Sequence, residues 1–167
     1  MLFESMLAIG ALLLITSGGA KLVDPEPTRG ALRSAGLPSA RPWVTVLALA
    51  EVVAGAFVLV SDWALPRMAV SALYLGFAAF AGWALVRDLP VQSCGCFGRT
   101  DTPPSIGHVV ITVTIAVSAG FAGSWQPPLA SAGEPQSLAV LGFGAVGAYL
   151  CYLMMAELPA LQRSVRR

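Results

Sequence analysis

The clearest apolar run of this chain reads MAVSALYLGFAAFAGWALV, from Met68 to Val86, and Arg67 and Arg87 flank it. An α-helix rises about 1.5 Å per residue, so about 20 apolar residues are needed to cross the hydrocarbon core of a bilayer. This run has that length and contains no charged residue. It predicts a membrane-spanning helix whose two ends are marked by arginines at the membrane surfaces.

The remainder of the chain has the same character. Hydrophobic residues make up 56% of the sequence, charged residues make up 11%, and the mean hydropathy is +0.75, which excludes an ordinary soluble protein. We expect an all-α fold, an integral membrane helical bundle, because backbone groups in lipid must be paired within their own helix and no barrel-like alternation is visible. The bundle should be a single transmembrane domain over residues 1–167, with four core transmembrane helices and a fifth. The expected spans cover about residues 5–22, 43–61, 67–87, 106–123 and 138–158.

Two local patterns refine this bundle. The polar segment between the first two spans is expected to contain a short interfacial helix from Thr28 to Ala35, capped by Thr28 or an earlier turn residue and broken at Gly36 and Pro38. The last span carries a face of small residues, which we expect to pack within the chain rather than to form a dimer. These small residues are Gly142, Gly144, Gly147 and Ala148.

Two thiols one residue apart occupy the polar gap between the third and fourth spans, in the segment Cys94-Gly95-Cys96. A polar loop at the membrane edge gives cysteines the access and thiolate character that reactivity needs. A disulfide between these two residues would close a very small ring, and strained, exposed disulfides are easily reduced. The pair therefore favours thiol–disulfide chemistry, in which one thiolate attacks and the other resolves the mixed disulfide. A soft-metal site for copper(I) or zinc and a reduced, structural pair are the alternatives.

Two ionisable side chains are candidates to assist the thiols. Glu51 interrupts the second span, where an ionisable residue is costly and marks a functional site by default. It is expected either to relay protons for thiol or quinone chemistry or to form a structural bridge with Lys21, the only lysine. His108, the only histidine, lies at the start of the fourth span, where it would stabilise a thiolate, act as a base, or be an ordinary interfacial residue. The candidate catalytic residues are therefore Cys94, Cys96, Glu51 and His108.

Charge and redox chemistry predict opposite membrane sides for the cysteines. With five spans, every basic residue except Arg67 falls on one side, which the positive-inside rule assigns to the cytoplasm. The loop that contains Cys94 and Cys96 lies on that same side. Disulfides, however, persist in oxidising compartments outside the cytoplasm. We expect a multi-pass protein of the cell membrane, and the side of the cysteine loop stays open.

Several short motifs occur in order along the chain and together resemble a known family. They are Ser17-Gly18-Gly19-Ala20-Lys21-Leu22, Asp24-Pro25, Ala50-Glu51-Val52, Gly55 and Cys94-Gly95-Cys96-Phe97-Gly98. Over about residues 5–122 the chain resembles the methylamine utilisation MauE family, within the wider DoxX-like group. The resemblance implies a multi-spanning bundle, a role in redox or disulfide maturation, and partnership with a membrane-anchored or secreted thioredoxin-like protein.

We therefore expect a membrane redox protein that exchanges disulfides or electrons with a thioredoxin-like partner or a membrane redox complex, in the maturation of a redox enzyme. Its activity would be that of a thiol-disulfide oxidoreductase, with a membrane quinone as the candidate electron acceptor and no bound metal. The alternative is a non-catalytic accessory or assembly subunit of a membrane complex, in which the cysteines are structural. The lipid bilayer is the expected surrounding, and the basic tail suits anionic lipid rather than nucleic acid. This tail contains Arg163, Arg166 and Arg167.

Overall fold

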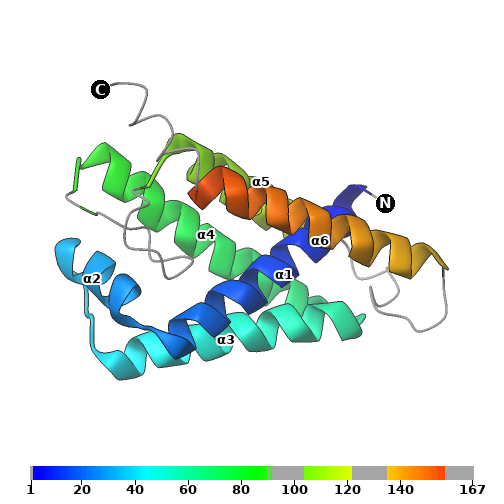
Figure 1. Ribbon diagram of the computed structural model, residues 1–167, viewed down its shortest axis with the longest axis horizontal. Helices are drawn as coiled ribbons and strands as arrows, with labels where there is room; N and C mark the ends of the chain where they lie inside the picture. Colours follow the sequence, from blue (N-terminus) through cyan, green and yellow to red (C-terminus); the bar gives the residue numbers. More distant parts are fainter. Residues whose placement is uncertain (1, 90, 92–103, 122–134, 157–167) are drawn as a thin grey trace.

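A computed structural model describes residues 2–89, 91, 104–121 and 135–156 of the chain, and these residues form six α-helices and no strand (Figure 1). The expected all-helical membrane bundle is confirmed. Its extent as a single transmembrane domain over the whole chain stays a prediction. The helices are α1 (Leu2–Val23), α2 (Glu26–Ser34), α3 (Arg41–Val60), α4 (Ala64–Val86), α5 (Ile106–Phe121) and α6 (Pro135–Ala156).

Helix length and composition separate the bundle into two groups. Three helices are long and apolar enough to cross a membrane, over Glu4–Val23, Arg41–Val60 and Ala64–Val86. The stretches Ile106–Phe121 and Leu138–Leu153 are shorter apolar helices. The fourth and fifth spans therefore have helices in the expected places, while their passage through the membrane stays a prediction.

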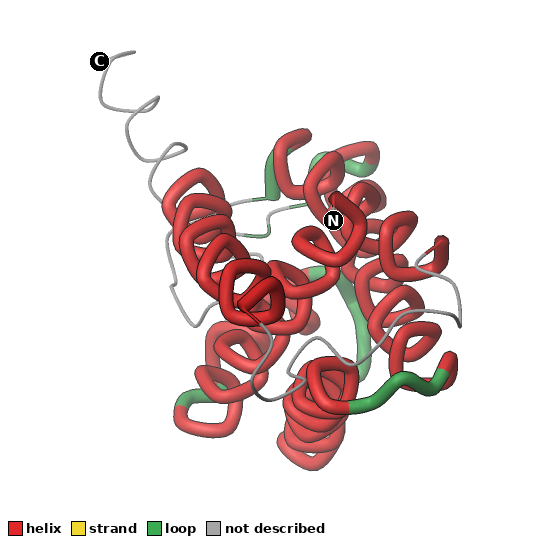
Figure 2. Tube along the Cα trace, turned by 90° about the vertical axis from the view of Figure 1, so that its right-hand side faces the viewer, coloured by secondary structure: helices red, strands yellow, loops and turns green. Residues whose placement is uncertain are grey.

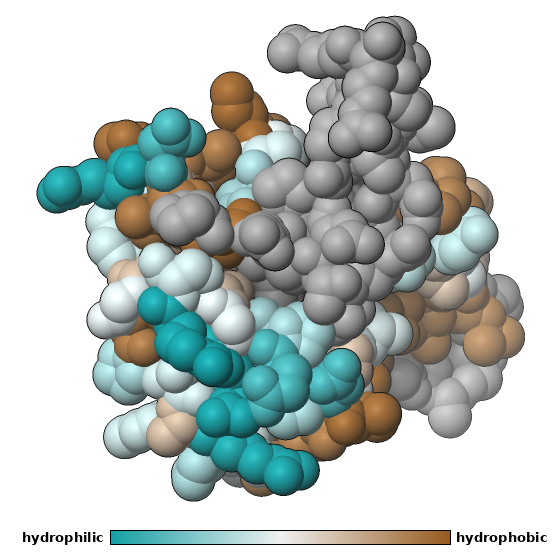
Figure 3. All heavy atoms as spheres, turned by 60° about the vertical axis from the view of Figure 1, so that its left-hand side comes forward, coloured by the Kyte–Doolittle hydropathy of each residue, from teal (hydrophilic) through white to brown (hydrophobic). Residues whose placement is uncertain are grey.

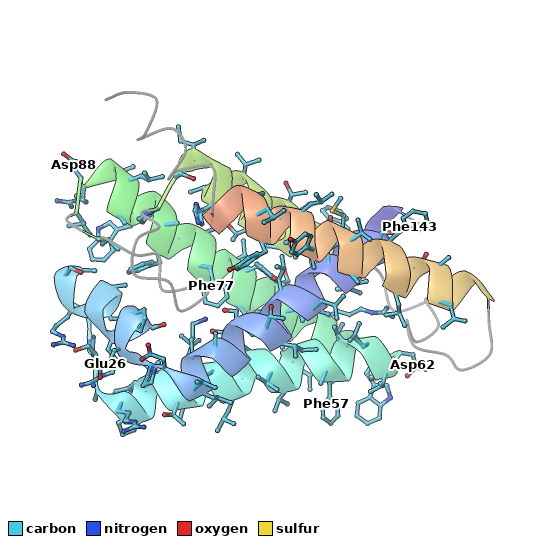
Figure 4. All side chains as sticks on the ribbon, in the orientation of Figure 1. Glu26, Phe57, Asp62, Phe77, Asp88 and Phe143 are labelled. Atoms are coloured by element: carbon cyan, nitrogen blue, oxygen red, sulfur yellow. The ribbon has the colours of Figure 1, made fainter. Side chains whose placement is uncertain are left out.

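The outward face of α3 is apolar along its length. Val46, Val53, Phe57 and Val60 are all more than half exposed, and Figure 4 shows Phe57 pointing away from the bundle. An exposed apolar surface of this extent is a liability in water. The same surface is suited to contact with lipid tails. The backbone groups of α3 are hydrogen-bonded within the helix, so only apolar side chains would face the bilayer.

The central element of the bundle is α1, which packs against α3, α5 and α6, while α4 packs mainly against α5. Figure 2 shows the other helices arranged around the start of α1. Leu14 of α1 is 1% exposed and belongs to the same core cluster as Val58 of α3 and Ile115 of α5. The Tyr74 hydroxyl of α4 donates a hydrogen bond to the Gly10 carbonyl oxygen at 2.7 Å, which ties α4 to the central helix.

The short helix expected between the first two spans is present as α2. It begins at Glu26, two residues before the expected start, with Pro25 at the N-cap position and no side chain capping the helix. The Glu26 N–H donates to the Asp24 side chain at 3.1 Å in the turn that leads into the helix. It ends before Gly36, which has a φ of 72°, a left-handed conformation that glycine adopts without strain. The Leu37 N–H then donates back to the Leu32 carbonyl at 2.8 Å, which closes the helix end.

Hydrophilic side chains gather at the end of the bundle where α2 lies, the left-hand end in Figure 1 (Figure 3). Glu26 pairs there with Arg29 and Arg33 on the exposed face of α2. The opposite face of α2 is buried and contains Pro27, Thr28 and Ala31. Ala31 forms a buried cluster with Ala84 and with Val91, which follows α4. The chain that leaves α4 toward the cysteines is therefore anchored on α2.

The small-residue face of α6 packs within the chain, as expected. Gly144 is buried, and a Cβ atom built on it would lie 2.8 Å from the Cβ atom of Ala8 in α1. Ala148 is 9% exposed and belongs to the core cluster. Gly142 does not take part, since a Cβ atom there would meet nothing within 4 Å. The arginines that flank α4 also differ, because Arg87 is exposed whereas Arg67 is 3% exposed and lies inside the bundle.

Candidate functional site

The close contact between α1 and α3 brings the ionisable residues of these helices together. A Cβ atom on Gly18 of α1 would lie 2.6 Å from the Ala48 carbonyl oxygen of α3. A Cβ atom on Gly55 of α3 would lie 2.7 Å from the Ala11 carbonyl oxygen of α1. Glycine at both positions lets the two backbones touch, which larger side chains would prevent. Glu51 lies between these contact points on α3, facing the C-terminal half of α1.

Ser17, Lys21 and Glu51 form one buried hydrogen-bonded group, called here the charge cluster. The Lys21 ammonium donates to Glu51 Oε2 at 2.7 Å and to the Ser17 hydroxyl at 2.5 Å. The Ser17 hydroxyl donates in turn to Glu51 Oε2 at 2.9 Å. Their exposed fractions are 5%, 3% and 0% in chain order. Ser17 and Lys21 are four residues apart, so both side chains lie on the same face of α1.

The two oxygens of the Glu51 carboxyl group have different surroundings. Oε2 accepts both hydrogen bonds of the charge cluster. Oε1 is fully buried and has no hydrogen-bond partner among the described residues. A buried acceptor without a donor is costly, so such an atom calls for a proton, a water molecule or a ligand group. Oε1 is therefore the atom of the Glu51 carboxyl group at which a proton, a water molecule or a ligand group could be accommodated.

A cavity of about 310 Å³ lies beside the charge cluster, between α1, α2, α3 and α4. Among the described residues that line it, Lys21 and Thr28 carry the polar side chains, and the rest of the wall is apolar. Phe77 of α4 contributes to the wall, and its ring centroid is 5.4 Å from the Lys21 ammonium nitrogen. In Figure 4, Phe77 lies on the side of α4 that faces α1 and α2.

The same cavity adjoins the root of the cysteine loop. Ala31 and Phe80 line the cavity and also pack against Val91, three positions before Cys94 in the sequence. The predicted catalytic residues Cys94 and Cys96 themselves lie outside the described residues. What the structure describes is the protein surface to which their loop is attached.

The fourth predicted residue, His108, lies in the first turn of α5 and is 3% exposed. Its Nδ1 atom is 2.8 Å from the Ser105 hydroxyl oxygen. Its Nε2 atom is buried and has no hydrogen-bond partner among the described residues. The structure therefore places Glu51 with Ser17 and Lys21, and His108 with Ser105, as two separate polar groups.

Sequence reasoning missed two polar residues of this bundle. Ser17 was noticed only as part of a motif, although its spacing of four residues from Lys21 was a usable signal. The sequence did not indicate that Arg67, which is expected at a membrane surface, is buried among the helices. Within the described ranges, no group of three or more His, Cys, Asp or Glu side chains is arranged to hold a metal ion. Cys151 is partly exposed and packs against the apolar core cluster.

Comparison with protein-family models gave a match over residues 1–126 to the family described as methylamine utilisation protein MauE. The matched region contains the charge cluster, the cavity-lining residues of α1 to α4, both loop cysteines and His108. Comparisons with curated proteins and with solved structures gave no match.

Proposed function

This chain belongs to the MauE family, and from that premise we propose that it is a membrane redox protein that exchanges disulfides through Cys94 and Cys96. Its partner in the proposal is a thioredoxin-like protein, and the exchange serves the maturation of a redox enzyme. The protein acts as a multi-pass protein of the cell membrane. Family membership by itself supports the coarser function, a membrane accessory role.

The proposed reaction moves one disulfide bond from this chain to its partner. A partner thiolate attacks one sulfur of the Cys94–Cys96 disulfide, which breaks that S–S bond and forms a mixed disulfide. The second partner thiolate then attacks the mixed disulfide, which forms the partner's disulfide and releases the remaining cysteine thiolate of this chain. Two electrons and two protons thereby pass from the partner's dithiol to Cys94 and Cys96.

The observation that carries this proposal is the fully buried pair of Lys21 and Glu51 beside the root of the cysteine loop. A buried ion pair is weak evidence for stability, because apolar residues of similar volume usually do as well, and ionisable residues inside membrane bundles mark functional sites. Val91 is three positions before Cys94 in the sequence, and three residues of chain span at most about 11 Å. The charge cluster and the residue that precedes the cysteine loop thus adjoin the same cavity, which supports a role for the cluster in the proton transfers of thiol chemistry.

His108 supplies a second proton-transfer group in this proposal. Its buried Nε2 atom has no hydrogen-bond partner in the described part of the chain, while Nδ1 is held by Ser105. A histidine fixed through one ring nitrogen can present the other to a thiol as base, or as imidazolium stabilise a thiolate. His108 begins the helix that follows the cysteine loop, which suits this role.

Single-cysteine variants test the exchange in its reverse direction, in which the one remaining thiolate attacks the partner's disulfide and this chain has no second thiol to resolve the mixed disulfide. We would express Cys94→Ser and Cys96→Ser on a Cys151→Ser background and analyse adducts by non-reducing electrophoresis and mass spectrometry. One of the two variants should accumulate an adduct with a thioredoxin-like protein that dithiothreitol releases. Absence of an adduct in both variants, with maturation intact in the double variant, would contradict disulfide exchange.

The accessory or assembly role is the second candidate, and the family match favours it directly. It predicts that the Cys94→Ser/Cys96→Ser variant either behaves like the wild type or fails to assemble with its membrane partners. Disulfide exchange predicts that the same variant still assembles with its membrane partners but no longer supports maturation of the redox enzyme. Co-purification of the partners, measured beside maturation, separates the two candidates.

A further inference from the structure

The cavity between α1, α2, α3 and α4 has the size and composition of a small-molecule site. Its volume of about 310 Å³ is at the lower end of ligand pockets, which hold roughly 300–1,000 Å³ and combine apolar walls with few polar groups. Here the polar side chains of the described wall are those of Lys21 and Thr28, and two phenylalanines, Phe77 and Phe80, supply aromatic surface. The cavity therefore suits an apolar molecule with a planar ring and a hydrogen-bond acceptor.

The charge cluster decides between neutral and anionic occupants. The Lys21 ammonium at the cavity wall is already balanced by the Glu51 carboxylate at 2.7 Å. An anionic lipid head would bring a second negative charge close to that carboxylate, which is costly in a medium of low dielectric constant. A neutral carbonyl compound gains the field of the ammonium group without this repulsion.

We infer that this cavity binds the head group of a membrane quinone, which accepts electrons from the reduced cysteine pair. This inference rests on the proposed disulfide exchange, because that reaction leaves Cys94 and Cys96 as a dithiol. The balanced step is dithiol plus quinone to disulfide plus quinol. The two S–H bonds are lost, one S–S bond forms, and two electrons and two protons pass to the two carbonyl oxygens.

The charge cluster provides the polar chemistry of this site. Lys21 lines the cavity, and its ammonium nitrogen is 5.4 Å from the ring centroid of Phe77 in the same wall. In this inference the ammonium group orients a quinone carbonyl oxygen or donates a proton to it. Ser17 and Glu51 hold the same nitrogen atom at 2.5 and 2.7 Å, so a proton given up by Lys21 can be replaced from within the cluster. Glu51 Oε1, which has no hydrogen-bond partner among the described residues, is the atom where the replacement proton enters.

Two glycines of α4 provide a matched pair of variants. A Cβ atom on Gly76 or on Gly82 would meet nothing within 4 Å, so a side chain can start from either backbone position without a clash. Gly76 lines the cavity, whereas Gly82 is not part of its described wall. Both substitutions gain the same helix propensity. They therefore differ in whether the new side chain fills the cavity.

The experiment is photo-crosslinking of the full chain in lipid nanodiscs with an azidoquinone, using decylubiquinone or oleate as competitor and peptide mapping by mass spectrometry. We expect adducts on α2 and α4 that decylubiquinone prevents and oleate does not. The adduct yield should fall at least tenfold in Gly76→Leu and stay unchanged in Gly82→Leu. Equal labelling of both variants, no labelling, or displacement by oleate would each overturn the quinone site.

A second readout separates failure of the cavity from failure of the exchange. The Cys94→Ser/Cys96→Ser variant should still be crosslinked, because binding does not need the thiols. If partner exchange proceeds while crosslinking is absent, the quinone site is wrong and the proposed function stands. If crosslinking maps to the cavity while no partner adduct forms in any cysteine variant, the quinone site stands and disulfide exchange is wrong.

Discussion

The central helix α1 makes two close contacts that share glycines but differ in charge. Against α3, backbone approaches at Gly18 and Gly55 leave no room for a Cβ atom. Against α6, Gly144 makes an equally close approach to Ala8. The α1–α3 contact encloses the ion pair of Lys21 and Glu51, whereas Gly144 and Ala148 of α6 meet the apolar core around Ala8 and Ile9 of α1.

This difference shows that close helix packing in this bundle does not require a buried charge. Small residues bring helices together at both contacts. An ion pair adds a desolvation penalty that an apolar contact avoids, and its attraction often fails to exceed that penalty. This comparison supports the proposed function, in which Lys21 and Glu51 serve proton chemistry and their effect on stability is secondary.

The largest expected effect comes from breaking the pair. Lys21→Met leaves the Glu51 carboxylate buried without its cation, and removing one partner of a buried pair costs about 3–5 kcal/mol. The double variant Lys21→Met/Glu51→Leu removes both charges and should lie within about 1 kcal/mol of the wild type, or above it. Reversible unfolding in mixed micelles measures both. A double variant as unstable as the single one would mean that the pair is structural.

A smaller loss is expected from Ser17→Ala, which removes the hydroxyl that donates to Glu51 Oε2 at 2.9 Å. Hydrogen bonds to charged groups contribute about 1.5–3 kcal/mol. Thr16→Ala is the matched control, because the Thr16 hydroxyl bonds to carbonyls of its own helix on an exposed face. It should change the free energy of unfolding by less than about 0.5 kcal/mol. Equal losses in both variants would argue against a special role for Ser17.

The smallest effect distinguishes the glycines of the two contacts. In Gly18→Ala the new Cβ atom meets the Ala48 carbonyl oxygen, which is part of a helix backbone and cannot move alone. Overpacking of this kind costs about 1–3 kcal/mol. In Gly147→Ala the new atom meets the flexible end of the Ile9 side chain, so the loss should stay below about 1 kcal/mol. The same unfolding assay would contradict this account if Gly147→Ala proved the more harmful change.

The sequence predicted where helices lie along the chain better than which way they face. Apolar runs gave the helix positions because lipid requires long uncharged segments, and even the short helix α2 was found between them. Hydropathy fixes depth in the membrane but not rotation about the helix axis. The sequence therefore did not show that Arg67, expected at a membrane surface, is buried among the helices, and it left the pairing of Lys21 with Glu51 as one of two alternatives.

The candidate site was predicted in part for the same reason. Glu51 and His108 stood out as the ionisable residues of apolar segments, and both are buried. The cavity beside Lys21 is formed by residues from four helices that are far apart in the sequence. No periodicity within one helix reveals such a cavity, because it depends on how the helices pack.

The most direct test of disulfide exchange is the redox state of the loop thiols in living cells. We would label Cys94 and Cys96 with a membrane-impermeant maleimide on a Cys151→Ser background, with and without prior reduction, in intact and in permeabilised cells. The predicted result is that the thiols are labelled only after reduction. Labelling in intact cells would place the loop outside the cytoplasm, and labelling only in permeabilised cells would place it on the cytoplasmic side. Full labelling of both thiols without reductant would mean that they are kept reduced, and would contradict the disulfide exchange.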